Sequence, residues 1–401
     1  MKAFWVLTAA SAVSMVGTTF LFVAAPLAIL DTTESPALAV LSVAARTLPY
    51  LLGPLLGPLI DRYDRRVTFA VADLIQGAAV GAVPFFIAHD LIGCVFASLF
   101  VLGLANVASN VAADYGLIPA LVPADRLQKA TSHYNTAVLV ARFIGPALGG
   151  MVIGTLGTTW ALLIDAATFL LTASAATVLP RHPTGQRSDA AWTTMLREGF
   201  THFRARPDLR RLTIALAVYN LGAGALEPTL ITMGASHWSY SPGTMGLAVS
   251  CAAVAAAAGA WFSGRLSTGV RGHRHLLLWL TVCAAGAITL LVPWPCTALV
   301  GFCLVSLGEG GVNTVSMAYR QQNVTGDLAG RVNTIIRTFV MGAWAASALV
   351  LGLAADLFRM PWALLPVSLT AVGACWVWWR HTPPPTEEDL PLSPADARTQ
   401  P

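Results

Sequence analysis

The chain has 401 residues, of which 56% are hydrophobic and only 11% are charged. An ordinary soluble domain carries about 25% charged residues, so this chain has too little polar surface to stay dissolved in water. The composition excludes a soluble enzyme, a nucleic-acid-binding protein and a secreted disulfide scaffold, and it indicates a protein embedded in a lipid bilayer. The net charge of +4 therefore does not point to a nucleic-acid partner.

Hydrophobic runs of helix length follow one another along the chain and are separated by short polar breaks. A helix needs about 20 apolar residues to cross the hydrocarbon core of a bilayer, and none of the runs shows the alternation of membrane strands. We therefore predict an all-α membrane protein with twelve transmembrane helices. The predicted spans are 4–30, 37–59, 67–88, 91–117, 131–156, 158–180, 212–235, 243–264, 275–293, 297–319, 332–356 and 361–380.

The longest polar stretch between spans divides the twelve into six and six. We predict an N-terminal bundle over 1–180, a cytoplasmic linker over 181–211, a C-terminal bundle over 212–380 and a disordered cytoplasmic tail over 381–401. The linker places apolar residues at helical spacing among arginines, which is typical of a helix lying at the membrane surface. The tail is rich in proline and acidic residues, a composition that does not fold by itself.

The two halves share weak sequence matches in the same order. Pro26 late in the first span matches Pro228 late in the seventh, and Asp125 before the fifth span matches Asp327 before the eleventh, each 202 residues further along the chain. Two pseudo-symmetric six-helix bundles related by an axis along the membrane normal form a transporter architecture. The repeat therefore predicts a transporter.

The basic residues predict the orientation. Of the 24 lysines and arginines, 20 fall in loops and tails on the side of the N-terminus, and Arg359 alone falls on the other side. Cytoplasmic loops carry the excess of basic residues in membrane proteins, so we expect both termini in the cytoplasm. Only Lys2 and Lys129 are lysines, whereas alanine, arginine and glycine are abundant. That bias favours a bacterial cytoplasmic (inner) membrane.

The short loop after the second span carries a dense run of charges. The run is Gly57-Pro58-Leu59-Ile60-Asp61-Arg62-Tyr63-Asp64-Arg65-Arg66. One interpretation is a cytoplasmic anchor made of basic residues. The other is an inner gate, in which Asp61 faces the positive N-terminal end of another helix and the arginines pair with Asp73 or Asp114. Such contacts would close the gate and break when it opens.

This run resembles the loop signature of the major facilitator superfamily, and its D-R-x-D-R-R form is similar to the branch that contains macrolide and enterobactin exporters. Segment 117–123 and the fifth-span residues Gly145, Pro146, Gly149 and Gly150 support that branch, and the latter resemble the antiporter motif of drug exporters. The resemblance implies alternating access around a central cavity lined by spans one, four, seven and ten. The chain departs from the pattern in having Asp64 where glycine is usual and no arginine in span four.

The four fifth-span residues also have a purely structural interpretation. Small residues let transmembrane helices approach closely, and proline kinks are common in such helices. We expect close packing between spans five and eight as their direct role, and a gate that limits leakage as its consequence.

Charges within the predicted spans indicate the functional site more directly than the small residues do. Arg46, Arg142, Glu227 and Glu309 are predicted near mid-bilayer, and Asp165 about 10 Å from the outer end of its helix. A charge at a helix centre costs about 2.5–3.5 kcal/mol, so exposure to lipid is disfavoured. A structural ion pair, such as Arg46 with Asp165, explains any one of them. The five charges taken together favour a water-filled cavity over structural ion pairs, because the carboxylates come from both halves of the chain.

Under the resemblance, the cavity-lining spans contribute further polar residues. Polar groups spread along otherwise apolar helices suit an amphipathic molecule better than a sugar, although hydrogen bonding between helices is an alternative for each. These residues are Asn106 and Asn110, Tyr219 and Asn220, and Asn313, beside Glu227 and Glu309.

Three functions remain open. The first is a proton-coupled exporter of an amphipathic drug, antibiotic or siderophore, an antiporter linked to drug resistance, in which Glu227 or Glu309 binds and releases a proton. The second is an importer or uniporter of a small metabolite with the same fold. The third is a membrane-embedded prenyltransferase-type enzyme that uses the DxxD motif of Asp61 to Asp64. Such an enzyme needs a second acidic motif, which this sequence lacks. We expect a non-enzymatic monomer without cofactor or metal, whose partners are a small-molecule substrate, protons and the lipid bilayer.

Overall fold

The computed structural model describes residues 2–53, 63–113, 117–123, 126–179, 200–266, 272–323, 328–359 and 361–380. Every regular element in these ranges is helical and none is a strand, which confirms the all-α class. Ten of the described helices are long and apolar enough to cross a membrane. The other two predicted spans correspond to the shorter apolar segment Pro36–Leu52 and to Gly272–Thr289.

The first six spans form one bundle, hereafter the N-half (residues 2–179). Its boundaries follow local signals. Ser35 caps one helix by accepting a hydrogen bond from the Leu38 amide (3.3 Å), and Gly157 turns the chain between two others with φ of 90°. The helices are α1 (Lys2–Thr33), α2 (Pro36–Thr47) with η1 (Leu48–Leu52), α4 (Arg65–Ala88), α5 (Ile92–Ala112), the short α6 (Ile118–Leu121), α7 (Leu127–Leu156), and α8 (Thr158–Ala175) with η4 (Ala176–Val178).

The last six spans form the C-half (residues 200–380). The seventh span, predicted as one apolar run over 212–235, is broken after Ala223 into two helices. The helices are α10 (Pro207–Ala223), α11 (Leu226–Trp238), α12 (Pro242–Leu266), α13 (Gly272–Thr289), α14 (Pro295–Asn323), α15 (Leu328–Leu357), η5 (Trp362–Leu364) and α16 (Leu365–Trp379).

Parts of the predicted linker and the predicted tail lie outside the described residues. Of the linker helix, residues 200–205 are described and are helical. Phe203 is buried there and stacks on Phe339 of α15, with 6.2 Å between ring centroids. This segment therefore packs against the C-half through its apolar side, as an amphipathic helix does.

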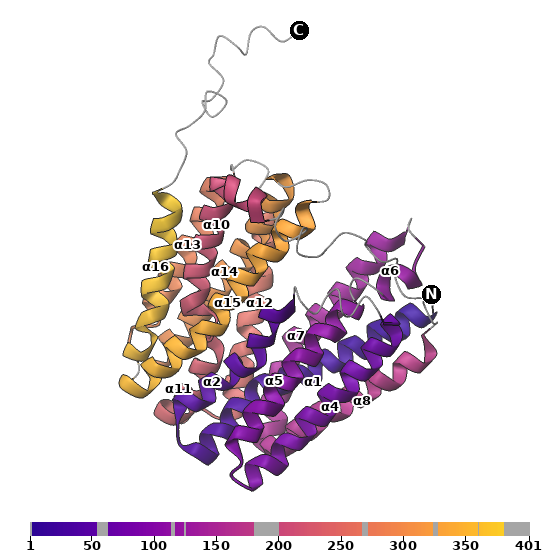
Figure 1. Ribbon diagram of the computed structural model, residues 1–401. Helices are drawn as coiled ribbons and strands as arrows, with labels where there is room; N and C mark the ends of the chain where they lie inside the picture. The colour runs from indigo at the N-terminus through magenta and orange to yellow at the C-terminus, as the bar shows by residue number, and fades with distance from the viewer. Residues whose placement is uncertain are drawn as a thin grey trace.

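The two halves meet at one end and diverge toward the end where α1 begins and α16 ends (Figure 1). Helix α7 packs along α12, and α2 packs along α15. At the closed end, the Ala37 amide at the start of α2 donates a hydrogen bond to Asp356 Oδ1 near the end of α15 (3.3 Å). The molecule is thus open on the side of the termini and closed on the opposite side.

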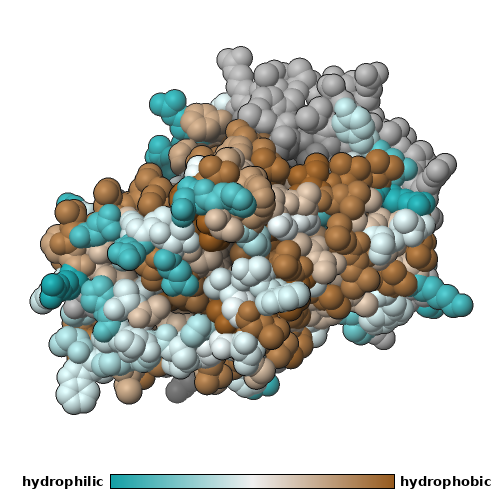
Figure 2. All heavy atoms as spheres, turned by 90° about the horizontal axis from the view of Figure 1, so that it is seen from below, coloured by the Kyte–Doolittle hydropathy of each residue, from teal (hydrophilic) through white to brown (hydrophobic). Residues whose placement is uncertain are grey.

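Large hydrophobic side chains cover much of the outer surface. Met151, Leu247 and Leu353 are each more than half exposed, at 62%, 58% and 62%. Seen from the closed end, hydrophobic residues occupy wide areas between scattered hydrophilic groups (Figure 2). Such an extent of exposed apolar surface is unfavourable in water and matches a lipid environment.

Candidate substrate cavity

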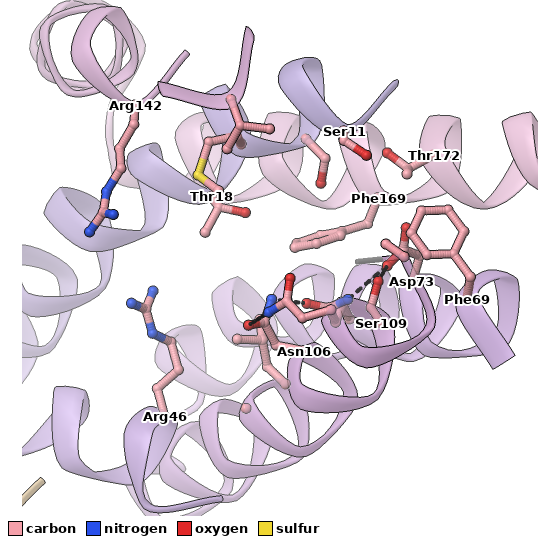
Figure 3. A pocket seen from close by; sticks show the side chains of 18 of the residues that line it. Ser11, Thr18, Arg46, Phe69, Asp73, Asn106, Ser109, Arg142, Phe169 and Thr172 are labelled. Carbon is pink, nitrogen blue, oxygen red and sulfur yellow. Dashed lines mark hydrogen bonds between the residues drawn. The ribbon is translucent and has the colours of Figure 1, made fainter. Parts of the chain in front are cut away.

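A polar cavity of about 330 Å³ lies in the N-half and reaches Trp344 of the C-half. Arg46 of α2 and Arg142 of α7 both line it, and their guanidinium groups point toward one another across it (Figure 3). The Arg46 guanidinium lies over the ring of Phe22, 3.6 Å from its centroid. Neither arginine takes part in an ion pair with the described carboxylates. The alternative interpretation, a structural ion pair of Arg46 with Asp165, is therefore not formed.

The opposite wall of this cavity carries carboxamides and a carboxylate. Asn106 donates from Nδ2 to Gln76 Oε1 (2.9 Å), and Asn110 donates from Nδ2 to Asn106 Oδ1 (2.9 Å). Gln76 and Ser109 in turn donate to Asp73 Oδ1, at 2.8 and 2.7 Å. Asp73 thus lies in the cavity network, and among the described residues no arginine of the loop acts on it, which differs from the gate pairing predicted for it.

A second cavity, of about 580 Å³, lies in the C-half. Glu309 and Asn313 of α14 are exposed to it. Glu309 lies within charge–charge range of Arg142, so the two cavities border the same interface between the halves. The predicted residues that line this cavity are Tyr219, Asn220, Glu309 and Asn313, joined by Arg320, Asn333 and Arg337.

Glu227 lies at the break in the seventh span. It is in the first turn of α11, where the positive end of the helix dipole favours a carboxylate. It lines neither of the two cavities and instead borders a small apolar pocket. Its charge nevertheless interacts with Arg142, Arg46 and Glu309. Glu227 is therefore the acidic residue on which both N-half guanidinium groups act.

The break is held open by the neighbouring helix α15. The Ala225 amide donates a hydrogen bond to Ser347 Oγ (2.9 Å), and Trp344 packs where Gly224 has no side chain. A broken helix is tolerated at membrane depth when its freed backbone groups find partners and it lines a cavity. Ser347 supplies one of those partners.

Replacement of Ser347 by alanine is expected to lower thermal stability, because it leaves the buried Ala225 amide without its acceptor. An unsatisfied buried backbone group costs about 1–3 kcal/mol. The measurement is thermal unfolding of the purified protein in detergent. Ser174→Ala is the control, since Ser174 is exposed and bonds only to its own helix; equal melting temperatures for the two variants would contradict the role assigned to Ser347.

Asp165 is buried differently from the other carboxylates. It is 0% exposed, and neither of its oxygens has a hydrogen-bond partner among the described residues. It packs against Gly17 of α1, where a Cβ would lie 2.7 Å from Asp165 Oδ1. Its charge interacts with Arg46 at a distance. Asp165 thus lies behind the cavity wall and does not line either cavity.

The fifth-span glycines lie at two helix contacts. Gly145 and Gly149 of α7 face Thr19 and Phe20 of α1 within the N-half. Gly150 faces α12, where an added Cβ would lie 3.1 Å from Gly246 Cα. Gly150 therefore lies at the expected contact between spans five and eight, whereas Gly145 and Gly149 pack against the first span instead.

Pro146 contributes to the same contact between the halves. Its carbonyl oxygen lies against Gly246, and the adjacent Ala147 amide donates across the interface to Ser250 Oγ (3.0 Å). The role of these residues as a gate stays a prediction.

The charged loop is only partly described. Gly57, Asp61 and Arg62 lie outside the described residues. Asp64 caps α4 by accepting from the Arg66 amide (2.8 Å), and Arg66 donates from Nη2 to the Thr177 carbonyl (2.9 Å). Arg65 begins α4. Asp64 therefore has a local structural role that explains a carboxylate at a position where glycine is usual.

Several cavity residues were not predicted. Tyr50 lies one helical turn after Arg46, and Gln76 lies one turn after Asp73, so helical periodicity from the predicted charges could have indicated both. Arg337 and Trp344 lie in the eleventh span, which the resemblance did not assign to the cavity. Arg337 is a charge within a span, so the cost of exposing a charge to lipid could have indicated it, whereas no sequence signal distinguishes Trp344 from residues that face lipid.

Comparisons with known proteins agree with this architecture. A curated relative, the enterobactin exporter EntS of Escherichia coli, is 26% identical over 343 residues, covering 79% of this chain and 81% of its own length. The uncharacterised MFS-type transporter y4rN of Sinorhizobium fredii is 26% identical over 326 residues, covering 75% and 76%.

Solved structures show the same fold at low identity. A bacterial homologue of the iron transporter ferroportin, in an inward-facing state, superposes with a TM-score of 0.77 at 14% identity over 94% of this chain and 98% of that one. The nucleoside transporter NupG superposes with a TM-score of 0.76 at 11% identity over 94% and 99%. The family model of the Major Facilitator Superfamily matches residues 7–239 and 212–399. The chain is a multi-pass membrane transporter that belongs to the Major Facilitator Superfamily.

Proposed function

We propose that this transporter is a proton-coupled exporter of an amphipathic small molecule, of the drug, antibiotic or siderophore class. The observation that carries the proposal is the set of opposite charges at the interface between the halves. Arg46 and Arg142 come from the N-half, whereas Glu227 and Glu309 come from the C-half. Any movement of one half against the other changes the distances between these charges.

Proton binding at Glu227 or Glu309 would change the attraction between the halves. An ionised carboxylate attracts Arg142 across the interface, and a protonated one does not. In a medium of low dielectric constant such a difference is worth several times its value in water. The proton can therefore bias the equilibrium between the inward-open and outward-open arrangements, which is the requirement for coupling.

The chemistry of the cavities supports an amphipathic substrate. Aromatic residues such as Phe22, Phe69 and Phe169 lie beside hydroxyl, carboxamide and guanidinium groups in the N-half cavity. Pockets for organic ligands combine an apolar lining with a few polar groups in this way. Exporter relatives at 26% identity favour the outward direction, and cytoplasmic termini would make the described state inward-open.

The test uses inside-out membrane vesicles across which a proton gradient is imposed, with the acidic side in the lumen. A fluorescent amphipathic dye, a macrolide and a tris-catecholate serve as probes. At least one probe is expected to accumulate in the vesicles and to release protons from the lumen as it enters. Accumulation that is indifferent to a protonophore would contradict proton coupling, and uptake only into right-side-out vesicles would favour the importer.

A further inference from the structure

A continuous line of hydrogen-bonded side chains runs along the wall of the N-half cavity from Tyr50 to Asp73. Tyr50 Oη donates to Asn106 Oδ1, Asn106 donates to Gln76 Oε1, and Gln76 donates to Asp73 Oδ1. These four side chains, hereafter the Asp73 chain, come from η1, α5 and α4. The dashed lines in Figure 3 mark its bonds around Asn106 and Asp73. In a bundle of mainly apolar helices, such an unbroken polar line needs an explanation.

Asp73 at the end of this chain is a buried carboxylate without a compensating cation. It is 2% exposed, and none of the described charged side chains acts on it. The packed helices contribute Ser11 of α1, Ser109 of α5, and Phe169 and Thr172 of α8 to the cavity wall around it (Figure 3). The packed turn η4 carries no titratable side chain. Burial of an unpaired ionised carboxylate is costly, so this position favours a group that exchanges a proton.

The hydrogen bonds of the Asp73 chain all have the same direction. An ionised carboxylate can only accept hydrogen bonds, so Gln76 must present its NH₂ group to Asp73 and its oxygen to Asn106. Asn106 must then present its own NH₂ group to Gln76 and its oxygen to Tyr50. The Tyr50 hydroxyl therefore donates into the protein, and its hydrogen is not available to the cavity.

A proton on Asp73 Oδ1, the oxygen that Gln76 contacts, would reverse this order. The carboxyl group then carries an O–H donor, which is satisfied when Gln76 turns its oxygen toward Asp73. Asn106 turns in response and presents its NH₂ group to Tyr50, and Asn110, which donates to the same Asn106 oxygen, turns its own oxygen toward that NH₂ group. The Tyr50 oxygen now accepts, and its hydroxyl hydrogen is released toward the cavity, one helical turn from Arg46.

We propose that Asp73 binds a proton during the transport cycle and that the Asp73 chain transmits its protonation state to the cavity wall at Tyr50. The proposal rests on the proposed function of the same cavity and adds a proton site in the N-half to the carboxylates of the C-half. Asp73 acts on the substrate through Tyr50 and is therefore a positioning residue. Protonation adds a hydrogen-bond donor to the cavity wall, whereas deprotonation removes it.

The test is infrared difference spectroscopy of the full-length protein in lipid membranes during a pH titration. Acidification is expected to produce the C=O band of a protonated carboxyl group and, with the same midpoint, a shift of a tyrosine C–O band. Asp73→Asn should remove the carboxyl band, and Tyr50→Phe should remove the tyrosine band only. Asp165→Asn is the matched control, because Asp165 is equally buried but bonded to no such chain, and it should leave the tyrosine band and its midpoint unchanged.

Two further variants keep the test decisive if Asp73→Asn does not fold. Gln76→Leu should preserve the carboxyl band but abolish the response of the tyrosine band, because it interrupts the chain. Ser109→Ala should move both midpoints together to higher pH, because the ionised form loses a donor. A carboxyl band that is unaffected by both Asp73→Asn and Ser109→Ala would overturn the proposal, as would a tyrosine band that still responds in Gln76→Leu.

The spectroscopic result is independent of the vesicle assay. Coupled bands together with proton-indifferent efflux would refute the proposed coupling and leave the Asp73 chain intact. Proton-driven efflux with uncoupled bands would refute the chain alone. In transport, a one-proton contribution from Asp73 changes the rate up to about tenfold per pH unit, and Gln76→Leu should flatten that dependence.

Discussion

Replacement of Glu227 by glutamine is expected to abolish accumulation driven by a proton gradient while leaving the protein folded. Glutamine has the shape of glutamic acid but cannot bind or release a proton, and it removes the charge that interacts with both Arg46 and Arg142. A unit charge pair about 8 Å apart in a medium of effective dielectric constant near 20 is worth about 2 kcal/mol. Loss of one such term shifts a conformational equilibrium by more than tenfold.

The measurement is the ratio of probe accumulation in inside-out vesicles with and without the gradient, which should fall to about one for the variant. Glu309→Gln should give a smaller loss of gradient-driven accumulation, because Glu309 interacts with Arg142 but not with Arg46. Glu34→Gln is the matched control, since Glu34 is exposed in the connection between α1 and α2. Full gradient-driven accumulation by Glu227→Gln would show that the proton binds elsewhere.

Replacement of Gly150 by leucine is expected to force α7 and α12 apart and to destabilise the closed end of the molecule. A Cβ at this position would already lie 3.1 Å from Gly246 Cα and closer still to the Pro242 carbonyl oxygen. Overpacking at a tight contact costs about 1–3 kcal/mol. Because this contact joins the two halves, the expected result is loss of transport together with a lower melting temperature.

Gly154 provides the matched control on the same helix. It lies one turn further along α7, and a Cβ there would meet nothing within 4 Å. Gly154→Leu should therefore keep both the melting temperature and transport. If Gly150→Leu behaves in the same way, the close approach of α7 and α12 is not required for the closed end.

These two results concern different parts of one cycle. Opening of the closed end requires loss of the contacts made there, including the hydrogen bonds from the Ala147 amide to Ser250 and from the Ala37 amide to Asp356. Both are single bonds in which a backbone amide meets a side-chain oxygen. A net contribution of about 0.5–1.5 kcal/mol for each is small enough for substrate or proton binding to overcome.

The residue pattern alone predicted the membrane class, the positions of the helices and the family. These properties depend on sums over many residues: about 20 consecutive apolar side chains make a span whatever their order. The resemblance in 57–66 and in the fifth span then indicated a fold that the family match confirms. The same information indicated that Arg46, Arg142, Glu227 and Glu309 matter, because a charge in a span is costly wherever it points.

Only the tertiary structure decided which of these charges face one another. Rotation of a helix by about 100° per residue turns a cavity residue into a lipid-facing one, and the sequence does not record that angle. Asp73, which was predicted at a gate, therefore lies in the hydrogen-bond network of the N-half cavity. Asp165, which was predicted in the substrate pathway, lies behind the wall of that cavity. Gly224 and Pro228 are local signals of a break in the seventh span, but its partner Ser347 is far away in the chain, so no local pattern could reveal what stabilises the break.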